Sequence, residues 1–216
     1  MRAALFDLDR TLVRKETATL YVKWQREVGL ATTRDLARVM YWVLKYTLGI
    51  LDADAVAKRA IGTLAGKPER AMIEECDAWF ASHVLPHVAS MGRRKVEEHL
   101  RAGDLVAIVT GAMPYVARPL ARLLGIAHVV ASELEVDERG VFTGRPVEPL
   151  CYGEGKVVRT ERLAAAHGFD LGEAVFYSDS LTDLPLLSRV GEPIAVNPDP
   201  RLRRHAKKRG WRIEAW

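Results

Sequence analysis

The sequence has few of the residues that build disulfide frameworks or zinc sites. It contains two cysteines in 216 residues, Cys76 and Cys151, which stand far apart and lack the spacing of metal ligands. The six histidines are scattered along the chain, so no His or Cys cluster favours zinc. This cysteine usage argues against a disulfide scaffold and is typical of a reduced, cytoplasmic protein.

Long apolar runs, internal repeats and low-complexity segments are also missing. The longest apolar stretch, 39–51, is interrupted by Lys45 and is too short to span a bilayer. An apolar strand begins at once, with no signal-peptide pattern before it. The net charge of +4 fits an anionic ligand, but no nucleic-acid-binding motif accompanies the basic segment 201–209. We therefore expect neither stable membrane insertion nor a nucleic acid partner.

The second half of the chain alternates between β-rich and helical segments. Strands are predicted at 104–109, 128–134, 174–178 and 193–196, with a hairpin at 135–142. Helices are predicted at 93–102, 114–124, 155–167, 181–188 and 199–209. Together with the apolar strand before Asp7, this alternation predicts an α/β fold with a doubly wound parallel sheet covered on both faces.

Residues 16–88 contain no convincing strand. Four helices are predicted there, at 17–28, 33–48, 53–64 and 68–83. Four successive helices inside an α/β chain indicate a separate helical module. We therefore expect a core domain of residues 1–14 and 89–216, with a helical domain of residues 15–88 inserted after the first strand.

Three of the predicted strands end in small polar or acidic residues. A parallel sheet brings the carboxyl ends of its strands to one edge, where ligands bind. Two carboxylates spaced two apart point the same way in an extended chain, and burying both is costly without a cation or a proton. These strand-end residues are Asp7 and Asp9, Thr110 and Gly111, and Asp179 with Asp183.

The residue types at this edge favour phosphate chemistry. Clustered carboxylates suit Mg²⁺, which prefers a few carboxylates together with a substrate phosphate. Thr110 and Gly111 precede a helix and could receive an anion, and Lys156 follows Gly153 and Gly155 at another helix start. In phosphoryl transfer, one carboxylate can act as nucleophile and a second can move the proton.

The same residues, in their order along the chain, carry a family resemblance. The segments 7–11, 110–111, Lys156 and 178–183 resemble the four motifs of the haloacid dehalogenase (HAD) superfamily. The insertion 15–88 resembles its helical C1-type cap, and the Asp183-Leu-Pro-Leu-Leu ending is similar to subfamily IB, the phosphoserine-phosphatase-like branch. The resemblance implies a Rossmann-like HAD core and a phosphoric monoester hydrolase.

The resemblance also implies roles for individual residues. Asp7 would be the nucleophile and Asp9 the general acid and base, while Thr110, Gly111 and Lys156 would bind the phosphoryl oxygens. Mg²⁺ would be held by Asp7, the Asp9 carbonyl and Asp179, with Asp183 in support.

Two further residues bear on the substrate. Glu16 stands where phosphoserine phosphatases carry a glutamate for the substrate's amino group, and Arg59 is a candidate for a carboxylate. Arg10 and Thr182 depart from the serine-specific pattern, which leaves phosphoserine, histidinol phosphate and other amino-alcohol phosphates open as small phosphorylated substrates.

Other functions remain open from the sequence. The same aspartyl-phosphate could serve a phosphotransferase or mutase, and a lysophospholipid is a further possible substrate. A non-catalytic binding module is disfavoured because Asp9 and Lys156 are both present. A receiver-type signalling domain is disfavoured by the Asp-x-Asp pair and the helical insertion. We expect a monomer or a homodimer.

Overall fold

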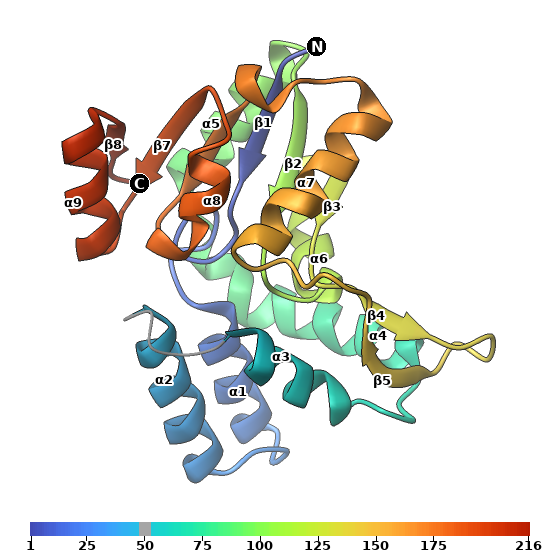
Figure 1. Cartoon of the computed structure of the whole chain (residues 1–216). Coiled ribbons are helices and arrows are strands. Elements are labelled where there is room, and N and C mark those ends of the chain that lie inside the picture. The colour runs from blue at the N-terminus through green and yellow to red at the C-terminus, as the bar shows by residue number, and fades with distance from the viewer. Residues whose placement is uncertain (48–52) are drawn as a thin grey trace.

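A computed structural model describes residues 1–47 and 53–216, and its centre is a six-stranded sheet (Figure 1). The strand order is β3-β2-β1-β6-β7-β8, and every neighbouring pair is parallel. The first strand of the chain thus lies in the interior of the sheet, as predicted. The strands are β1 (Ala3–Phe6), β2 (Leu105–Val109), β3 (His128–Val130), β6 (Val175–Ser178), β7 (Glu192–Val196) and β8 (Arg212–Glu214).

Both faces of this sheet are covered by helices. Alternate side chains of β1 enter two different hydrophobic clusters, with Ala4 and Phe6 in one and Ala3 and Leu5 in the other. Helices α5 (Ser90–Arg101) and α6 (Pro114–Leu124) contribute to the first cluster. Helices α7 (Glu154–His167), α8 (Leu184–Leu187) and α9 (Pro200–Arg209) contribute to the second. The predicted doubly wound α/β fold is confirmed.

Four helices lie between β1 and α5. They are α1 (Thr17–Glu27), α2 (Thr33–Thr47), α3 (Ala53–Gly62) and α4 (Glu69–Trp79), followed by one π-helical and one 3-10 turn. Figure 1 shows α1, α2 and α3 beyond the end of the sheet to which the β1 arrow points. The predicted helix end at 48 and part of the stretch 39–51 lie outside the described residues. No helix of the described part is long and apolar enough to cross a bilayer.

Helix α4 packs against α6 and thereby joins the inserted helices to the core. Tyr115 donates a hydrogen bond to Glu69 over 2.6 Å, and Arg122 pairs with Asp77. One hydrophobic cluster contains Met72 and Cys76 of α4 together with side chains from the core. The inserted helices and the core thus share packing, and the predicted division at 14/15 and 88/89 stays a prediction.

The structure differs from the sequence prediction mainly in short elements and at element ends. Strand β8 was not predicted, because its three residues are partly exposed and carry no apolar run. The strand predicted over 128–134 ends at Val130, after which Ser132 N–H bonds to the Ala112 carbonyl in the loop region. The predicted hairpin forms as β4 (Leu134–Val136) and β5 (Phe142–Pro146), outside the main sheet.

Candidate active site

The centre of the site is a buried lysine held between two carboxylates. Lys156 Nζ lies 2.9 Å from Asp7 Oδ1 and 2.7 Å from Asp183 Oδ1. Asp183 also accepts a 2.7 Å hydrogen bond from Ser178 Oγ at the end of β6. The lysine is only 3 % exposed, so its charge is compensated by these partners rather than by water.

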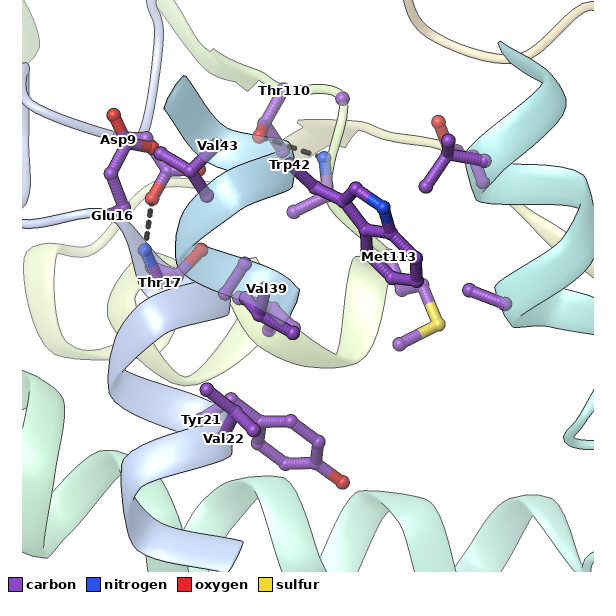
Figure 2. A pocket seen from close by; sticks show the side chains of 18 of the residues that line it. Asp9, Glu16, Thr17, Tyr21, Val22, Val39, Trp42, Val43, Thr110 and Met113 are labelled. Carbon is purple, nitrogen blue, oxygen red and sulfur yellow. Dashed lines mark hydrogen bonds between the residues drawn. The ribbon is translucent and has the colours of Figure 1, made fainter. Parts of the chain in front are cut away.

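Asp7 directly follows β1, and its neighbours are ordered by hydrogen bonds. Its own N–H donates to the Tyr177 carbonyl of β6 over 2.9 Å. The Asp9 carboxylate accepts the Thr17 N–H of α1 over 2.6 Å (Figure 2). This contact fixes Asp9 at the positive N-terminal end of α1, which favours its charged form.

Arg10 takes a conformation that places its side chain beside a second acidic strand end. Its φ angle is +55°, in the left-handed region, and its Nε lies 3.3 Å from Asp179 Oδ2. The Arg10 side chain is partly exposed, whereas Asp179 is buried. Arg10 therefore gives Asp179 a positive neighbour at the mouth of the site.

Backbone donors follow β2. Thr110 is 1 % exposed, and its Oγ1 accepts the Ala112 N–H over 3.1 Å. A Cβ atom at Gly111 would lie 2.2 Å from the Tyr152 ring, so only glycine fits there while the ring keeps its place. The segment 110–112 can thus approach a ligand through its backbone.

Burial in this pocket raises the pKa values of four of its carboxyl groups. Burial raises the pKa of Asp7 to about 7 against the lowering effect of Lys156, and burial followed by the nearby Asp9 charge raises the pKa of Glu16 to about 8. Burial also raises the pKa of Asp9, and burial together with Asp7 raises that of Asp179 well above the ordinary value. A cation entering the pocket would restore the charged forms.

The residues face one cavity of about 650 Å³. Eight of the nine predicted site residues line it: Asp7, Asp9, Glu16, Thr110, Gly111, Lys156, Asp179 and Asp183. The structure does not bring the ninth to the cavity, because Arg59 is exposed on α3 and absent from the lining.

Sequence reasoning missed three residues of the site. Ser178 orients Asp183, and Tyr152 covers Gly111. Asp199 is 3 % exposed and accepts the Leu181 N–H over 2.8 Å while it caps α9. Two of them had a readable signal, because Ser178 opens the motif-like segment 178–183 and an aspartate before Pro200 is a typical helix start.

No three His, Cys, Asp or Glu side chains in the described part of the chain form a complete metal-ligand group. The nearby acidic oxygens of Asp7 and Asp179, together with the Asp9 carbonyl, are hard donors and suit a metal that keeps several waters. The donor chemistry and the raised pKa values of the carboxyls therefore fit Mg²⁺ and do not fit a closed zinc centre.

Comparison with known proteins identifies the family. A model of the haloacid dehalogenase-like hydrolases matches residues 4–188. A histidinol-phosphatase of Neisseria meningitidis is 33 % identical over 214 residues, which cover 97 % of this chain and 96 % of the relative. The phosphoserine phosphatase SerB1 of Mycobacterium tuberculosis is 32 % identical, covering 98 % of this chain and 70 % of the relative.

Solved structures agree with this result. A Bordetella pertussis protein of unknown function has a TM-score of 0.87 at 34 % identity, covering 99 % and 97 % of the two chains. A phosphoserine phosphatase with an analogue of the phospho-aspartyl intermediate has a TM-score of 0.72 at 22 % identity, covering 99 % of this chain and 92 % of that chain, and shows the shared fold. The chain belongs to the haloacid dehalogenase-like hydrolase family, and within it to the phosphatase type of enzyme.

Proposed function

We propose that the protein is a Mg²⁺-dependent phosphatase that cleaves a small phosphate monoester through an aspartyl-phosphate. The observation that carries this proposal is the contact between Lys156 and Asp7 at the floor of the cavity. An ammonium group beside a carboxylate at the end of an interior strand would attract the phosphoryl group and orient the carboxylate toward it.

The reaction follows from the positions of two carboxyls. The Asp7 carboxylate attacks phosphorus, and the ester P–O bond breaks as Asp9 gives its proton to the departing alkoxide. Water then attacks the phosphorus of the aspartyl-phosphate while Asp9 takes a proton from it. Inorganic phosphate leaves, and Asp7 returns as a carboxylate.

The remaining groups stabilise charge on the phosphoryl oxygens. Lys156, the Thr110 hydroxyl and the Gly111 N–H are the donors available on the cavity side. Asp7, Asp179 and the Asp9 carbonyl would hold Mg²⁺, with Asp183 in support through Lys156. The metal would neutralise part of the phosphate charge when bound.

An amino-alcohol phosphate is the substrate class that this site fits. Glu16 lines the cavity with Asp9, and its raised pKa would fall when an ammonium group approaches. Two relatives are named histidinol-phosphatase and phosphoserine phosphatase, and both names refer to the phosphate ester of an amino alcohol.

The proposal is tested by phosphate release from purified protein. Mg²⁺ should support hydrolysis of an aryl phosphate and of at least one amino-alcohol phosphate, and EDTA should abolish it. Asp7→Asn should lower kcat at least a thousandfold because it removes the nucleophile. Asp77→Asn, which changes an exposed acid of α4 outside the cavity, is the control and should keep full activity.

Activity that persists in Asp7→Asn, or that survives EDTA, would exclude this mechanism.

Phosphotransfer is distinguished from hydrolysis by adding an acceptor alcohol and measuring which product forms. The phosphatase proposal requires inorganic phosphate to remain the main product at millimolar acceptor.

A further inference from the structure

The cavity continues from the catalytic acids into an apolar compartment. Figure 2 shows Asp9 and Glu16 on one side and the Trp42 indole extending from α2 into the open space. Described residues of all four inserted helices and of the segment before α6 line this part of the cavity. Its apolar walls include Val22, Val39, Trp42, Val56, Ile61 and Met113.

Apart from Lys156 beside the catalytic acids, the described lining residues include two cations, Arg38 and Lys67. The Arg38 guanidinium lies 2.5 Å from Asp35 and 5.5 Å from the centre of the Trp42 ring. Lys67 lines the cavity from the segment between α3 and α4. Among the described lining residues of α1, α2 and α3, the wall around Trp42 thus offers mainly apolar contact and one cation, which is already paired with an acid.

The placement of apolar and charged lining residues indicates which substituent the amino-bearing carbon of the substrate can carry. An ester bound with its phosphate at Lys156 and its amine near Glu16 would direct its third substituent toward the apolar wall. A carboxylate against that wall would lose its hydration, and Arg38, the cation beside Trp42, is already paired with Asp35. A neutral ring or branched alkyl group would instead bury apolar area against Trp42 and its neighbours.

Resting on the proposed function, we propose that the substrate is the phosphate of a 2-amino alcohol whose third substituent is uncharged and bulky. The apolar compartment selects this substituent and rejects the carboxylate of phosphoserine. Trp42 is the specificity-determining residue, because its indole lines the cavity and extends from α2 into it in Figure 2.

Four esters with the same aminoethyl phosphate unit test the proposal. Ethanolamine phosphate has no third substituent, phosphoserine adds a carboxylate and histidinol phosphate adds an imidazolylmethyl group. At pH 8, where a free imidazole is neutral, kcat/KM for histidinol phosphate should exceed that for ethanolamine phosphate at least tenfold. Phosphoserine should be no better than ethanolamine phosphate. Phenylalaninol phosphate should behave like histidinol phosphate.

Variants of one helix locate the selection. Trp42→Ala should reduce the ratio of kcat/KM between histidinol phosphate and ethanolamine phosphate to less than threefold, and Trp42→Phe should keep most of it. Met40→Ala is the matched control, because Met40 lies on the same helix, is 53 % exposed and does not line the cavity. That variant should leave the ratio unchanged.

The outcomes separate this inference from the proposed function. A preference for phosphoserine would overturn the inference while the phosphatase proposal stands, as would a ratio that Trp42→Ala leaves intact. Preference for lysophosphatidate over every amino-alcohol ester would also overturn it. Failure to hydrolyse any of these esters and an aryl phosphate would remove the proposed function itself. The comparison of esters uses the wild-type protein, so it holds even where a variant fails to fold.

Discussion

Glu16 is the residue whose environment says most about recognition. It immediately precedes α1, it is largely removed from water, and burial and the Asp9 charge raise its pKa to about 8. In the free protein it is therefore mostly protonated at neutral pH. An ammonium group at this position would favour the carboxylate and gain a charge-assisted hydrogen bond.

Glu16→Gln tests this contact because it keeps the shape and removes the charge. The ratio of kcat/KM for an amino-alcohol phosphate to that for an aryl phosphate should fall at least tenfold. A tenfold loss corresponds to about 1.4 kcal/mol, which lies near the lower end for a hydrogen bond to a charged group. The control is Gln25→Ala, because Gln25 lines the same cavity and carries no charge. This variant should leave the ratio unchanged. An unchanged ratio in Glu16→Gln would exclude the amino contact.

At the residue scale, the sequence allowed most of the candidate site to be predicted. Asp7, Thr110 and Asp179 follow strands of one parallel sheet, and that topology alone brings them to one edge. Arg59 could not be placed in this way, because the facing side of a helix depends on packing that no strand register fixes. Tyr152 was missed for a related reason, since its contact with Gly111 joins two loops.

At the scale of elements, the start of α7 is the part that positions the lysine. Gly155 packs so tightly that a Cβ atom there would lie 1.9 Å from the Leu150 carbonyl oxygen. Lys156 is the next residue, so any movement of this turn displaces the ammonium group from Asp7. Gly155 therefore serves close backbone packing, and Lys156 is directed at negative groups, as its place after two glycines at a helix start suggested.

Gly155→Ala should be destabilising and nearly inactive. We expect a loss of about 2 kcal/mol in the free energy of unfolding, typical of overpacking, and at least a hundredfold loss in kcat. Urea denaturation and phosphate release measure the two effects. Gly62→Ala at the end of α3 is the control, because open space surrounds that position and alanine favours helix by about 1 kcal/mol. Wild-type activity in Gly155→Ala would contradict this account of α7.

Elements with strong periodicity were predictable, and short ones were not. The predicted helices 155–167 and 199–209 both form, and each ends at a glycine with left-handed backbone. Strand β8 and the π-helical turn Phe80–Val84 arise from tertiary packing rather than from local pattern. The packing of α4 on α6 likewise has no local signature.

At the scale of the whole molecule, the inserted helices share hydrophobic packing with the sheet domain. One cluster joins Ile61, Met72 and Cys76 to Tyr115 and Phe142. A second places the fully buried Trp79 with residues that cover the sheet. These contacts remove apolar surface of both parts from water and make their stabilities interdependent.

We therefore expect the whole chain to unfold in one cooperative transition. Three of the five tryptophans, Trp24, Trp42 and Trp79, belong to the inserted helices. Their fluorescence should change with the same urea midpoint as the far-ultraviolet circular dichroism of the whole chain. Ala substitution at Tyr115, which bridges the two parts, should lower both midpoints together. Two separated transitions would show that the inserted helices unfold independently.

The interior position of β1 also has a consequence for synthesis. The ribosome makes β1 roughly 100 residues before β2 and roughly 170 before β6, yet β1 pairs with both. At ordinary translation rates the nascent strand waits on the order of ten seconds for its second neighbour. Its apolar side chains lack their sheet neighbours during that interval, and Asp7, the proposed nucleophile, lacks its partner until α7 and Lys156 have emerged. Under the proposed function, a newly made chain can therefore become active only after Lys156 and β6 have been synthesised.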